Sequence, residues 1–196
     1  MITTQRFLLR PLIADDVGNN YLSWLNTKEI VYIDYVKNHS TMEELKAYVS
    51  ERENKRNVLF LGIFTKKKQH IGNIKYEPID YKGKTAVMGI LIGDSDWRGK
   101  GVAIEVIKAS AHYLAERYGV TTIFLGVNQN NKAAVSAYQK VGFKIKEQNK
   151  NNIQIGLATR NKLALGTVQF GLYYKYFLKL SLIIAVLALN ILCIFK

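Results

Sequence analysis

A glycine-rich turn with two basic side chains is the part of this sequence best suited to chemistry. Residues 98–103 read Arg-Gly-Lys-Gly-Val-Ala, after an apolar run of strand character and before a long helical pattern. The first N–H groups of a helix have no intrahelical partner, and the helix dipole makes that end positive. Glycines also let the backbone approach an anion closely. We therefore expect this turn to bind a phosphate or pyrophosphate group.

Two common phosphate-binding motifs do not fit this chain. The dinucleotide fingerprint needs a glycine three residues after Gly101, where Ile104 stands. A P-loop ending in the Gly-Lys-Thr segment at 83–85 needs an upstream glycine, where Pro78 stands. The turn at 98–103 is therefore a phosphate-site candidate of another kind.

The elements that must position this turn follow from hydrophobic periodicity and turn residues. Strands are expected at 7–12, 58–64, 71–76, 85–93, 121–127, 143–148 and 153–158. Helices are expected around 21–25, from 41 onward, between Gly101 and Gly119, and at 132–141. The strand–helix–strand order over 85–127 requires a parallel crossover. The predicted class is α+β, with a mixed, mostly antiparallel sheet flanked by helices.

Two helix starts have recognisable caps. Asp15 and Asp16 are expected to cap the helix around 21–25. Thr41 and Glu44 form a capping-box pattern, in which the hydroxyl and the carboxylate each accept from a backbone N–H of the other residue.

Three segments together resemble one family. Arg98-x-x-Gly101-x-Ala103 resembles the coenzyme A pyrophosphate loop of the GNAT acetyltransferase superfamily, written Gln/Arg-x-x-Gly-x-Gly/Ala. The pattern from Asn128 to Phe143 resembles the second half of the same cofactor site. Residues 21–29 resemble the first helices of members related to ribosomal-protein and amino-sugar acetyltransferases. The resemblance covers residues 3–158 and implies a GNAT-like fold.

The resemblance implies transfer of an acetyl group from acetyl-CoA, as cosubstrate and without a metal, to a primary amine. The acceptor is a small molecule, with an amino sugar or nucleotide-linked amino sugar favoured, or a protein N-terminus. N–H groups of a splayed strand would polarise the thioester carbonyl, and the turn would hold the pyrophosphate. The implied cofactor-binding residues are Ile90, Leu91, Ile92, Arg98, Gly99, Lys100, Gly101, Val102, Ala103 and Asn131.

The resemblance also implies an acid and a base. Tyr138, two turns after Asn131 on the same helix, is the candidate acid for the leaving thiolate; a buried aromatic on an amphipathic helix is the alternative. Glu77, at the end of a strand, is the candidate base; a solvated edge carboxylate is the alternative. A chain of water molecules can also remove the proton, so activity does not require a side-chain base.

The amine acceptor is expected to lie near the first helices. Trp24, Asn26, Glu29 and Tyr32 gather aromatic and carboxylate groups there, which suit a cationic amine or an amino sugar. Plain packing is the alternative for Trp24 and Tyr32.

The composition excludes several classes of protein. The single cysteine, Cys193, excludes an internal disulfide and a Cys-based zinc site, and the three His lack metal-ligand spacing. The net charge of +13 divides into +7 over residues 1–149 and +6 over the acid-free residues 150–196. The N-terminus has no signal-peptide pattern, so we expect a cytoplasmic protein.

Residues 159–196 form a tail outside the predicted domain of residues 1–158. The uncharged stretch at 180–195 is bounded by Lys179 and Lys196, which suits a C-terminal anchor on the inner face of the membrane. Alternatively, residues 162–171 resemble the opening strand of aldo/keto reductases, which suggests a frame-shifted read-through into a neighbouring reductase sequence.

A second function remains as the alternative from another class. A membrane-attached or nucleic-acid-binding basic protein with a degenerate acetyltransferase fold would share the charge. The sequence lacks a basic stripe interleaved with aromatics, so we expect no nucleic-acid partner. The expected state is a monomer or homodimer.

Overall fold

The computed structural model describes residues 1–26, 41–148 and 152–159, and within them eight strands form one sheet. The strands are β1 (Ile2–Thr3), β2 (Phe7–Pro11), β3 (Leu59–Thr65), β4 (His70–Asp80), β5 (Thr85–Ile92), β6 (Thr122–Asn128), β7 (Lys144–Gln148) and β8 (Asn152–Ala158). The helices are α1 (Asn19–Leu25), α2 (Met42–Ser50), α3 (Val102–Tyr118) and α4 (Lys132–Val141), with short 3-10 turns η1 (Ala14–Asp16) and η4 (Ser95–Trp97).

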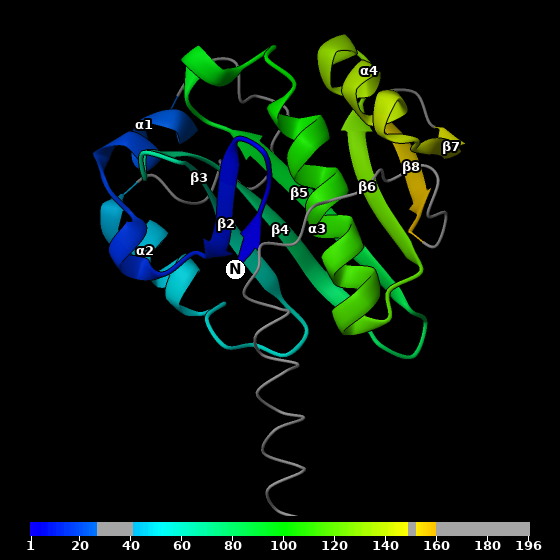
Figure 1. The fold of residues 1–196 in the computed structure, drawn as a ribbon, viewed down its shortest axis with the longest axis horizontal. Coiled ribbons are helices and arrows are strands. Elements are labelled where there is room, and N and C mark those ends of the chain that lie inside the picture. The colour runs from blue at the N-terminus through cyan, green and yellow to red at the C-terminus, as the bar shows by residue number, and fades with distance from the viewer. Residues whose placement is uncertain (27–40, 149–151, 160–196) are drawn as a thin grey trace, which may run out of the picture.

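The strand order is β1-β2-β3-β4-β5-β6-β8-β7, and every neighbouring pair is antiparallel except β5 and β6, which are parallel. The parallel pair results from the crossover through α3 (Figure 1). The predicted α+β class with a mixed, mostly antiparallel sheet is therefore confirmed.

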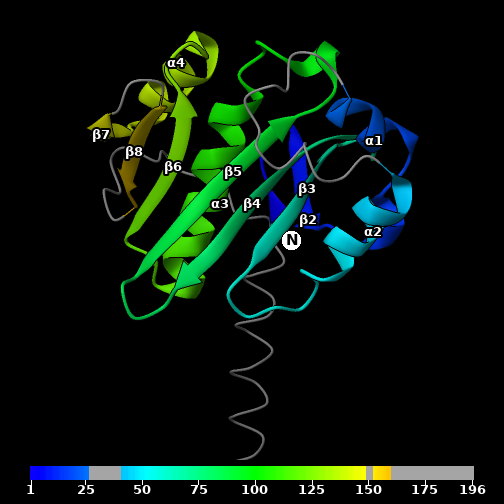
Figure 2. The same ribbon diagram turned by 180° about the vertical axis from the view of Figure 1, so that it is seen from behind.

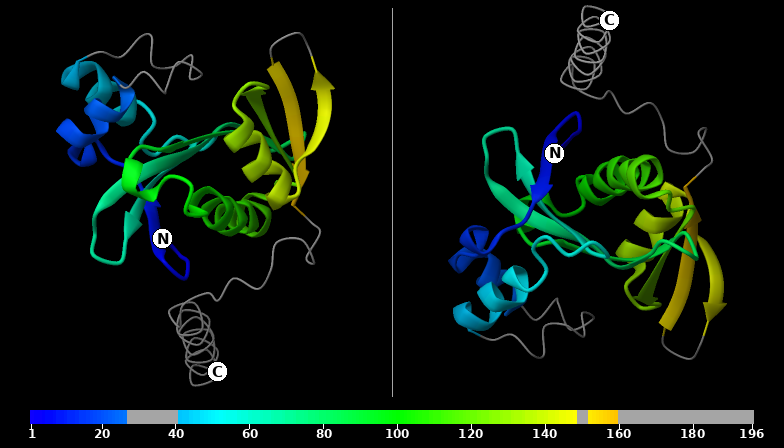
Figure 3. Two further views of the ribbon diagram at one scale, coloured as in Figure 1. Left: turned by 90° about the horizontal axis from the view of Figure 1, so that it is seen from above. Right: turned by 90° about the horizontal axis from the view of Figure 1, so that it is seen from below.

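The helices cover the two faces of the sheet unequally. Helices α1 and α2 lie on one face, and α3 lies on the other with α4 in contact with it (Figure 3). The larger core joins α3 to the sheet through apolar side chains such as Ile74, Met88 and Ile123. A smaller core joins α1 and α2, and Leu91 packs against it. The face that carries α1 and α2 leaves much of β5 and β6 uncovered (Figure 2).

Glycine sets both ends of α3, as the sequence predicts. Gly101 at its start and Gly119 at its end have φ of 75° and 67°, a left-handed conformation that glycine adopts without strain. Between them the buried residues repeat at helical spacing, including Val106, Ser110 and Leu114. The helix is thus fixed in length and pressed onto the sheet along one stripe.

The capping predictions have different outcomes. Thr41 and Glu44 form the expected capping box at the start of α2. The prediction for Asp15 and Asp16 was wrong, because α1 begins after Gly18. Asp16 lies in η1 and accepts a hydrogen bond of 2.7 Å from Arg10, so its carboxylate is already engaged when the helix begins.

The tail lies outside the described residues, together with the predicted anchor at 180–195 and the reductase-like segment at 162–171. Among the residues that the structure describes, no helix is both long and apolar enough to cross a membrane. The last described strand ends at Ala158. The boundary of the domain at residue 158 stays a prediction.

Candidate active site

Strand β5 is fully paired on one edge and mostly unpaired on the other. With β4 it pairs as far as Gly72 opposite Ile92, whereas with β6 it pairs only from Thr85 to Val87. Beyond Val87 the two parallel strands separate towards their C-terminal ends (Figure 2). No other described strand pairs with this edge of β5, so its polar backbone groups face an opening.

Alternation along β5 decides which N–H groups face that opening. The Lys84 carbonyl accepts from Thr121 N–H on the β6 side, at 2.7 Å, and Gly93 N–H donates to Ile71 on the β4 side, at 3.0 Å. Successive backbone groups point to opposite edges of a strand. The N–H groups of Ile90 and Ile92 therefore face β6, while that of Leu91 faces β4. Two of the three predicted N–H groups are at the opening.

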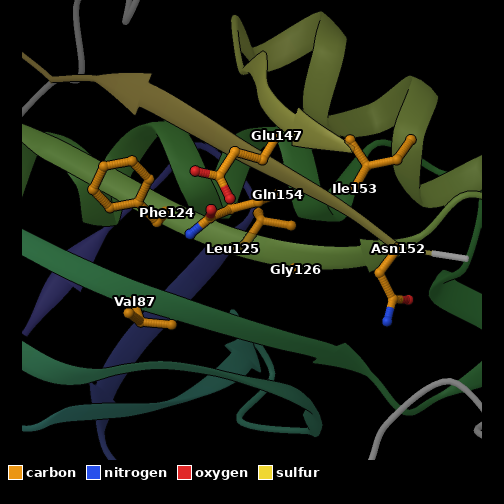
Figure 4. A pocket seen from close by; sticks show the side chains of 8 residues that line it. All are labelled: Val87, Phe124, Leu125, Gly126, Glu147, Asn152, Ile153 and Gln154. Carbon is orange, nitrogen blue, oxygen red and sulfur yellow. The ribbon is translucent and has the colours of Figure 1, made fainter. Parts of the chain in front are cut away.

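A cavity of about 340 Å³ lies where the strands separate (Figure 4). Val87 of β5 stands across it from the side chains of Phe124 and Leu125 on β6, while Glu147 and Gln154 belong to β7 and β8. Val87 is 44% exposed, which is high for an apolar strand residue. Val87 is still paired with Phe124, so the cavity begins at the last paired residues of the two strands.

The predicted phosphate turn leads into α3 as expected. Gly99 and Gly101 both have positive φ, and Gly101, the residue before the helix, supplies no side-chain cap. The first N–H groups of the helix, from Val102 and Ala103, therefore have no intrahelical acceptor. The Lys100 side chain is exposed beside them. This arrangement suits an anionic ligand.

Arg98 contacts the end of β5. Its guanidinium donates hydrogen bonds to the carbonyl oxygens of Ile92 and Gly93, each at 3.0 Å. Arg98 therefore links the phosphate turn to the unpaired end of β5. Its predicted contact with pyrophosphate stays a prediction.

Arg6 is a neighbour of the turn that sequence reasoning missed. Its guanidinium donates to the Lys100 carbonyl at 2.9 Å and forms an ion pair with Glu105 at 2.7 Å. Arg6 lies between β1 and β2 and connects that end of the sheet to the turn. Since 94 residues separate Arg6 from Lys100, no local motif could have indicated this contact.

Helix α4 carries the second half of the predicted donor site. The Asn131 carboxamide oxygen accepts from Ala134 N–H at 3.1 Å, so it caps the helix, and its amide group remains as a donor. Tyr138 packs against the larger core, with its ring 5.7 Å from that of Phe143. Burial raises the pKa of Tyr138 to about 12, so the phenol stays protonated at neutral pH.

A second cavity, of about 200 Å³, lies on the other side of β5, beneath α1 and α2. Its lining residues are Tyr21, Leu25, Tyr48, Phe60, Asn73, Lys75, Gly89, Ile90 and Leu91. Lys75 donates a hydrogen bond to the Tyr48 hydroxyl, and Asn73 stands two residues before it on β4. The cavity combines aromatic walls with a few polar groups, as binding sites for small molecules do.

Glu77 lies on the same face of β4 as Asn73 and Lys75, in an ion-pair network. Its carboxylate accepts from Lys75 at 2.7 Å and from Arg52 at 2.8 Å. Burial raises the pKa of Glu77, but the hydrogen bonds from both cations outweigh burial and hold the pKa below its usual value. Glu77 is therefore paired and half-buried, unlike the solvated edge carboxylate weighed from the sequence.

Two of the four predicted acceptor residues, Trp24 and Asn26, lie among the residues that the structure describes. Trp24 is 8% exposed and packs on His70, with ring centroids 5.0 Å apart. A Cβ atom at Gly93 would lie 2.0 Å from the Trp24 ring, so Trp24 rests directly on that backbone. The packing interpretation of Trp24 therefore agrees with its position, while Asn26 is exposed at the end of α1. Glu29 and Tyr32, the other two predicted acceptor residues, lie outside the described residues.

Comparison with known proteins points to one family. The family model of the acetyltransferase (GNAT) domain matches residues 6–144. Mycothiol acetyltransferase of Kytococcus sedentarius is 26% identical over 138 residues, which cover 69% of this chain and 44% of that protein. Spermine/spermidine N(1)-acetyltransferase of Bacillus subtilis is 38% identical over 50 residues, 26% of this chain and 33% of that protein. The chain thus spans less than half the length of these curated relatives.

The fold has many counterparts among solved structures. Spermidine N-acetyltransferase from Vibrio cholerae, solved in complex with CoA and spermine, has a TM-score of 0.70 at 19% identity, covering 80% of this chain and 98% of that one. An acetyltransferase of the GNAT family from Bacillus anthracis has a TM-score of 0.70 at 16% identity, covering 82% of this chain and 99% of that one. At such identities the likeness establishes the fold.

Proposed function

The chain belongs to the acetyltransferase (GNAT) domain family, and on that premise we propose that it transfers the acetyl group of acetyl-CoA to a primary amine of a small molecule. The separation of β5 from β6 carries this proposal, because β5 leads through η4 directly to the glycine turn before α3. The unpaired strand edge offers N–H groups to a thioester carbonyl, and the helix start attracts a pyrophosphate. In acetyl-CoA the thioester and the pyrophosphate lie at the two ends of the pantetheine arm.

The donor half of the site fits acetyl-CoA through backbone groups. In this proposal residues 99–103 bind the pyrophosphate, and the N–H groups of Ile90 and Ile92 stabilise negative charge on the thioester oxygen. The Asn131 amide donor adds a contact to the arm between them, and Arg98 keeps the turn attached to β5. Acetyl-CoA, when bound, supplies the activated acetyl group.

Proton removal from the amine is assigned to water. A Lys-like amine has a pKa of about 10.4 and arrives mostly as the ammonium ion at neutral pH. Glu77, the predicted base, is held by two cations, and its lowered pKa reduces its tendency to take a proton. The geometry therefore favours water over direct transfer to Glu77.

Tyr138 is proposed to stabilise the departing sulfur. Full transfer of its proton to a thiolate of pKa about 8.5 would be uphill by roughly 5 kcal/mol, given the pKa of Tyr138 of about 12. A hydrogen bond from the protonated phenol to the sulfur has no such cost. This role differs from the one predicted from the sequence, in which Tyr138 gives its proton to the thiolate.

The cavity beneath α1 and α2 is proposed as the acceptor site, with an amino sugar or nucleotide-linked amino sugar as the favoured amine. Its aromatic walls and its polar groups on β4 support this choice. Two curated relatives are named as a mycothiol acetyltransferase and a spermine/spermidine N(1)-acetyltransferase, so an amine screen must include polyamines as well.

The test uses the full chain. Acetyl-CoA should raise its melting temperature, and a screen of amino sugars, polyamines and amino-terminal peptides should show release of the free CoA thiol with at least one amine. Absence of stabilisation, together with binding to liposomes or nucleic acid, would favour the basic protein with a degenerate fold.

A cytoplasmic location, with attachment to the inner face of the membrane through residues 180–195, is also proposed. The uncharged stretch between Lys179 and Lys196 supports it. Flotation of the full chain with liposomes, compared with a chain ending at residue 159, tests the attachment. Equal flotation of both would contradict it.

A further inference from the structure

One buried polar group in the acceptor cavity has no partner. Asn73 is 4% exposed and lines the cavity, and its Nδ2 has no hydrogen-bond partner among the described residues. The other described buried polar residues, Thr65, Ser110 and Thr159, all form hydrogen bonds. An unsatisfied buried donor costs about 1–3 kcal/mol, so its retention at a cavity points to a ligand.

His70 fixes the direction of the Asn73 amide. The His70 Nε2 lies 3.0 Å from the Gly72 carbonyl oxygen and 2.8 Å from the Asn73 Oδ1. A carbonyl oxygen accepts only, so Nε2 must carry the hydrogen, and the amide therefore presents its oxygen to His70. The NH2 group points away from His70 and keeps both hydrogens for another acceptor.

The His70 ring is itself held firmly. It stacks on Phe64 with centroids 4.8 Å apart and meets Trp24 edge-on at 5.0 Å. Burial lowers the pKa of His70, and the hydrogen bonds to Asn73 and Gly72 raise it by less. The net pKa lies below its ordinary value, so the neutral ring is favoured at pH 7. The packing of Trp24 thus supports His70, and His70 orients Asn73.

Asn73 lies on the side of β5 where the amine substrate is proposed to bind, so its Nδ2 group is placed to contact the amine and not acetyl-CoA. Asn73 pairs with Leu91 across the β4–β5 ladder, on the edge of β5 that faces away from β6. The thioester is proposed at the opposite edge of β5. Lys75, two residues further along β4, places a second N–H donor on the same face. No carboxylate is among the described residues that line this cavity.

We propose that Asn73 donates a hydrogen bond from Nδ2 to an oxygen of the amine substrate, and that the enzyme therefore selects oxygen-bearing amines, such as amino alcohols and amino sugars, over oxygen-free polyamines. This inference rests on the proposed function and names its substrate class. A site built to bind a hydroxyl group discriminates against the analogue that lacks it, because the buried donor is then left unpaired.

A matched pair of amines tests the inference. 1,3-Diamino-2-propanol and 1,3-diaminopropane differ by one hydroxyl group. The wild-type chain should show a kcat/KM at least tenfold higher for the hydroxyl compound. Asn73→Leu should bring this ratio close to one, with the loss on the hydroxyl compound and no change in KM for acetyl-CoA. Ser110→Ala removes a buried hydroxyl on α3 and should keep the wild-type ratio.

A second variant keeps the test decisive if Asn73→Leu does not fold. His70→Phe retains the ring stack but removes the Nε2–H donor, so the Asn73 amide is free to rotate and the ratio should fall partway. A kcat/KM ratio near one in the wild type, or a wild-type ratio retained in either variant, overturns this inference but leaves the proposed function standing. Stabilisation by acetyl-CoA without acetylation of any amine would instead contradict the proposed function.

Discussion

The two halves of the proposed site lie on the two sides of β5 and consist of different groups. Towards β6, the donor half consists of backbone: the N–H groups of Ile90 and Ile92 and the glycine turn before α3. Towards β4, the acceptor half consists of side chains, from Tyr48 on α2 and from Asn73 and Lys75 on β4. The proposed donor half offers the same hydrogen-bond donors whatever its side chains are, because peptide N–H groups provide them.

This difference separates recognition of acetyl-CoA, which backbone groups can provide, from the choice of amine, which depends on side chains. A backbone-built half recognises phosphate and carbonyl groups that every acetyl-CoA molecule carries. A side-chain-built half changes with each substitution and sets the choice of amine. Variants of the donor half should therefore alter acetyl-CoA binding, and variants of the acceptor half should alter amine preference or local stability.

The largest expected effect belongs to Tyr138, a side chain of α4 that is separate from the backbone groups of the donor half. It is proposed to act on the leaving sulfur and not to bind CoA. Tyr138→Phe should lower kcat about tenfold to hundredfold, with little change in the Kd for CoA, because only the phenol donor is lost. Tyr113→Phe on α3 is the control. Unchanged turnover in Tyr138→Phe would remove Tyr138 from the mechanism.

The pH dependence of Tyr138 gives a related test. Its pKa of about 12 keeps the phenol protonated from neutral pH up to about pH 10. Ionisation of Tyr138 should therefore cause no decline in turnover in that range. Any alkaline decline seen in the wild-type chain should also appear in Tyr138→Phe. A decline that is present in the wild type and absent from Tyr138→Phe would mean that the phenol ionises at a much lower pH than its burial allows.

The next largest effect tests the backbone half directly. Gly101→Ala should raise the Kd for CoA about tenfold, because φ of 75° strains any other residue and the first turn of α3 must shift. Gly119→Ala introduces the same strain at the far end of the helix, where φ is 67°. Calorimetric titration should show weaker CoA binding only at Gly101. Equal affinities in the two variants would contradict the phosphate site.

A smaller effect is expected in the ion-pair network of the acceptor half. Glu77→Gln should lower the free energy of unfolding by roughly 1 kcal/mol at pH 7, reduced by solvent screening since a quarter of the side chain is exposed. The pKa of Glu77 is lowered in the folded state, so its contribution is present above its ordinary value of 4.5 and lost as the pH falls through the folded pKa.

Denaturant unfolding at several pH values checks this prediction. The difference between the wild type and Glu77→Gln should shrink at acidic pH, whereas Glu116→Gln, at an exposed position of α3, should show little difference at any pH. A difference that grows on acidification would mean that the carboxylate is not stabilised by its cations.

The smallest effect is expected for Lys100. Its exposed side chain adds charge near the phosphate turn but no fixed contact, so Lys100→Ala should weaken CoA binding about twofold to threefold at low salt. The effect should vanish at high salt. A tenfold, salt-independent loss would mean that side chains, rather than the backbone, carry the donor half.

The elements that carry the proposed donor half could be predicted from the sequence because their determinants are local. Gly101, Gly119 and the periodicity between them define α3, and the order of strands and helices follows from alternation and turns. Asn131 marks the start of α4 for the same reason, as a side-chain cap.

The acceptor half could not be predicted in the same way. Tyr48, Asn73 and Lys75 meet only in the folded chain, and no motif links them. Trp24 has the type of a binding residue, yet a glycine on the neighbouring segment, Gly93, leaves room for it to pack. Glu77 is paired with cations that the sequence places 2 and 25 residues away.

Acetyl-CoA is proposed to bind where β5 and β6 separate and along the first turn of α3. Titration of the full, isotopically labelled chain with CoA, followed through its backbone amide resonances, tests this binding site. The largest shifts are expected at residues 99–103 and at Ile90 and Ile92, with Leu91 and residues of β1 and β2 much less affected. Saturable binding with shifts confined to other segments would contradict it.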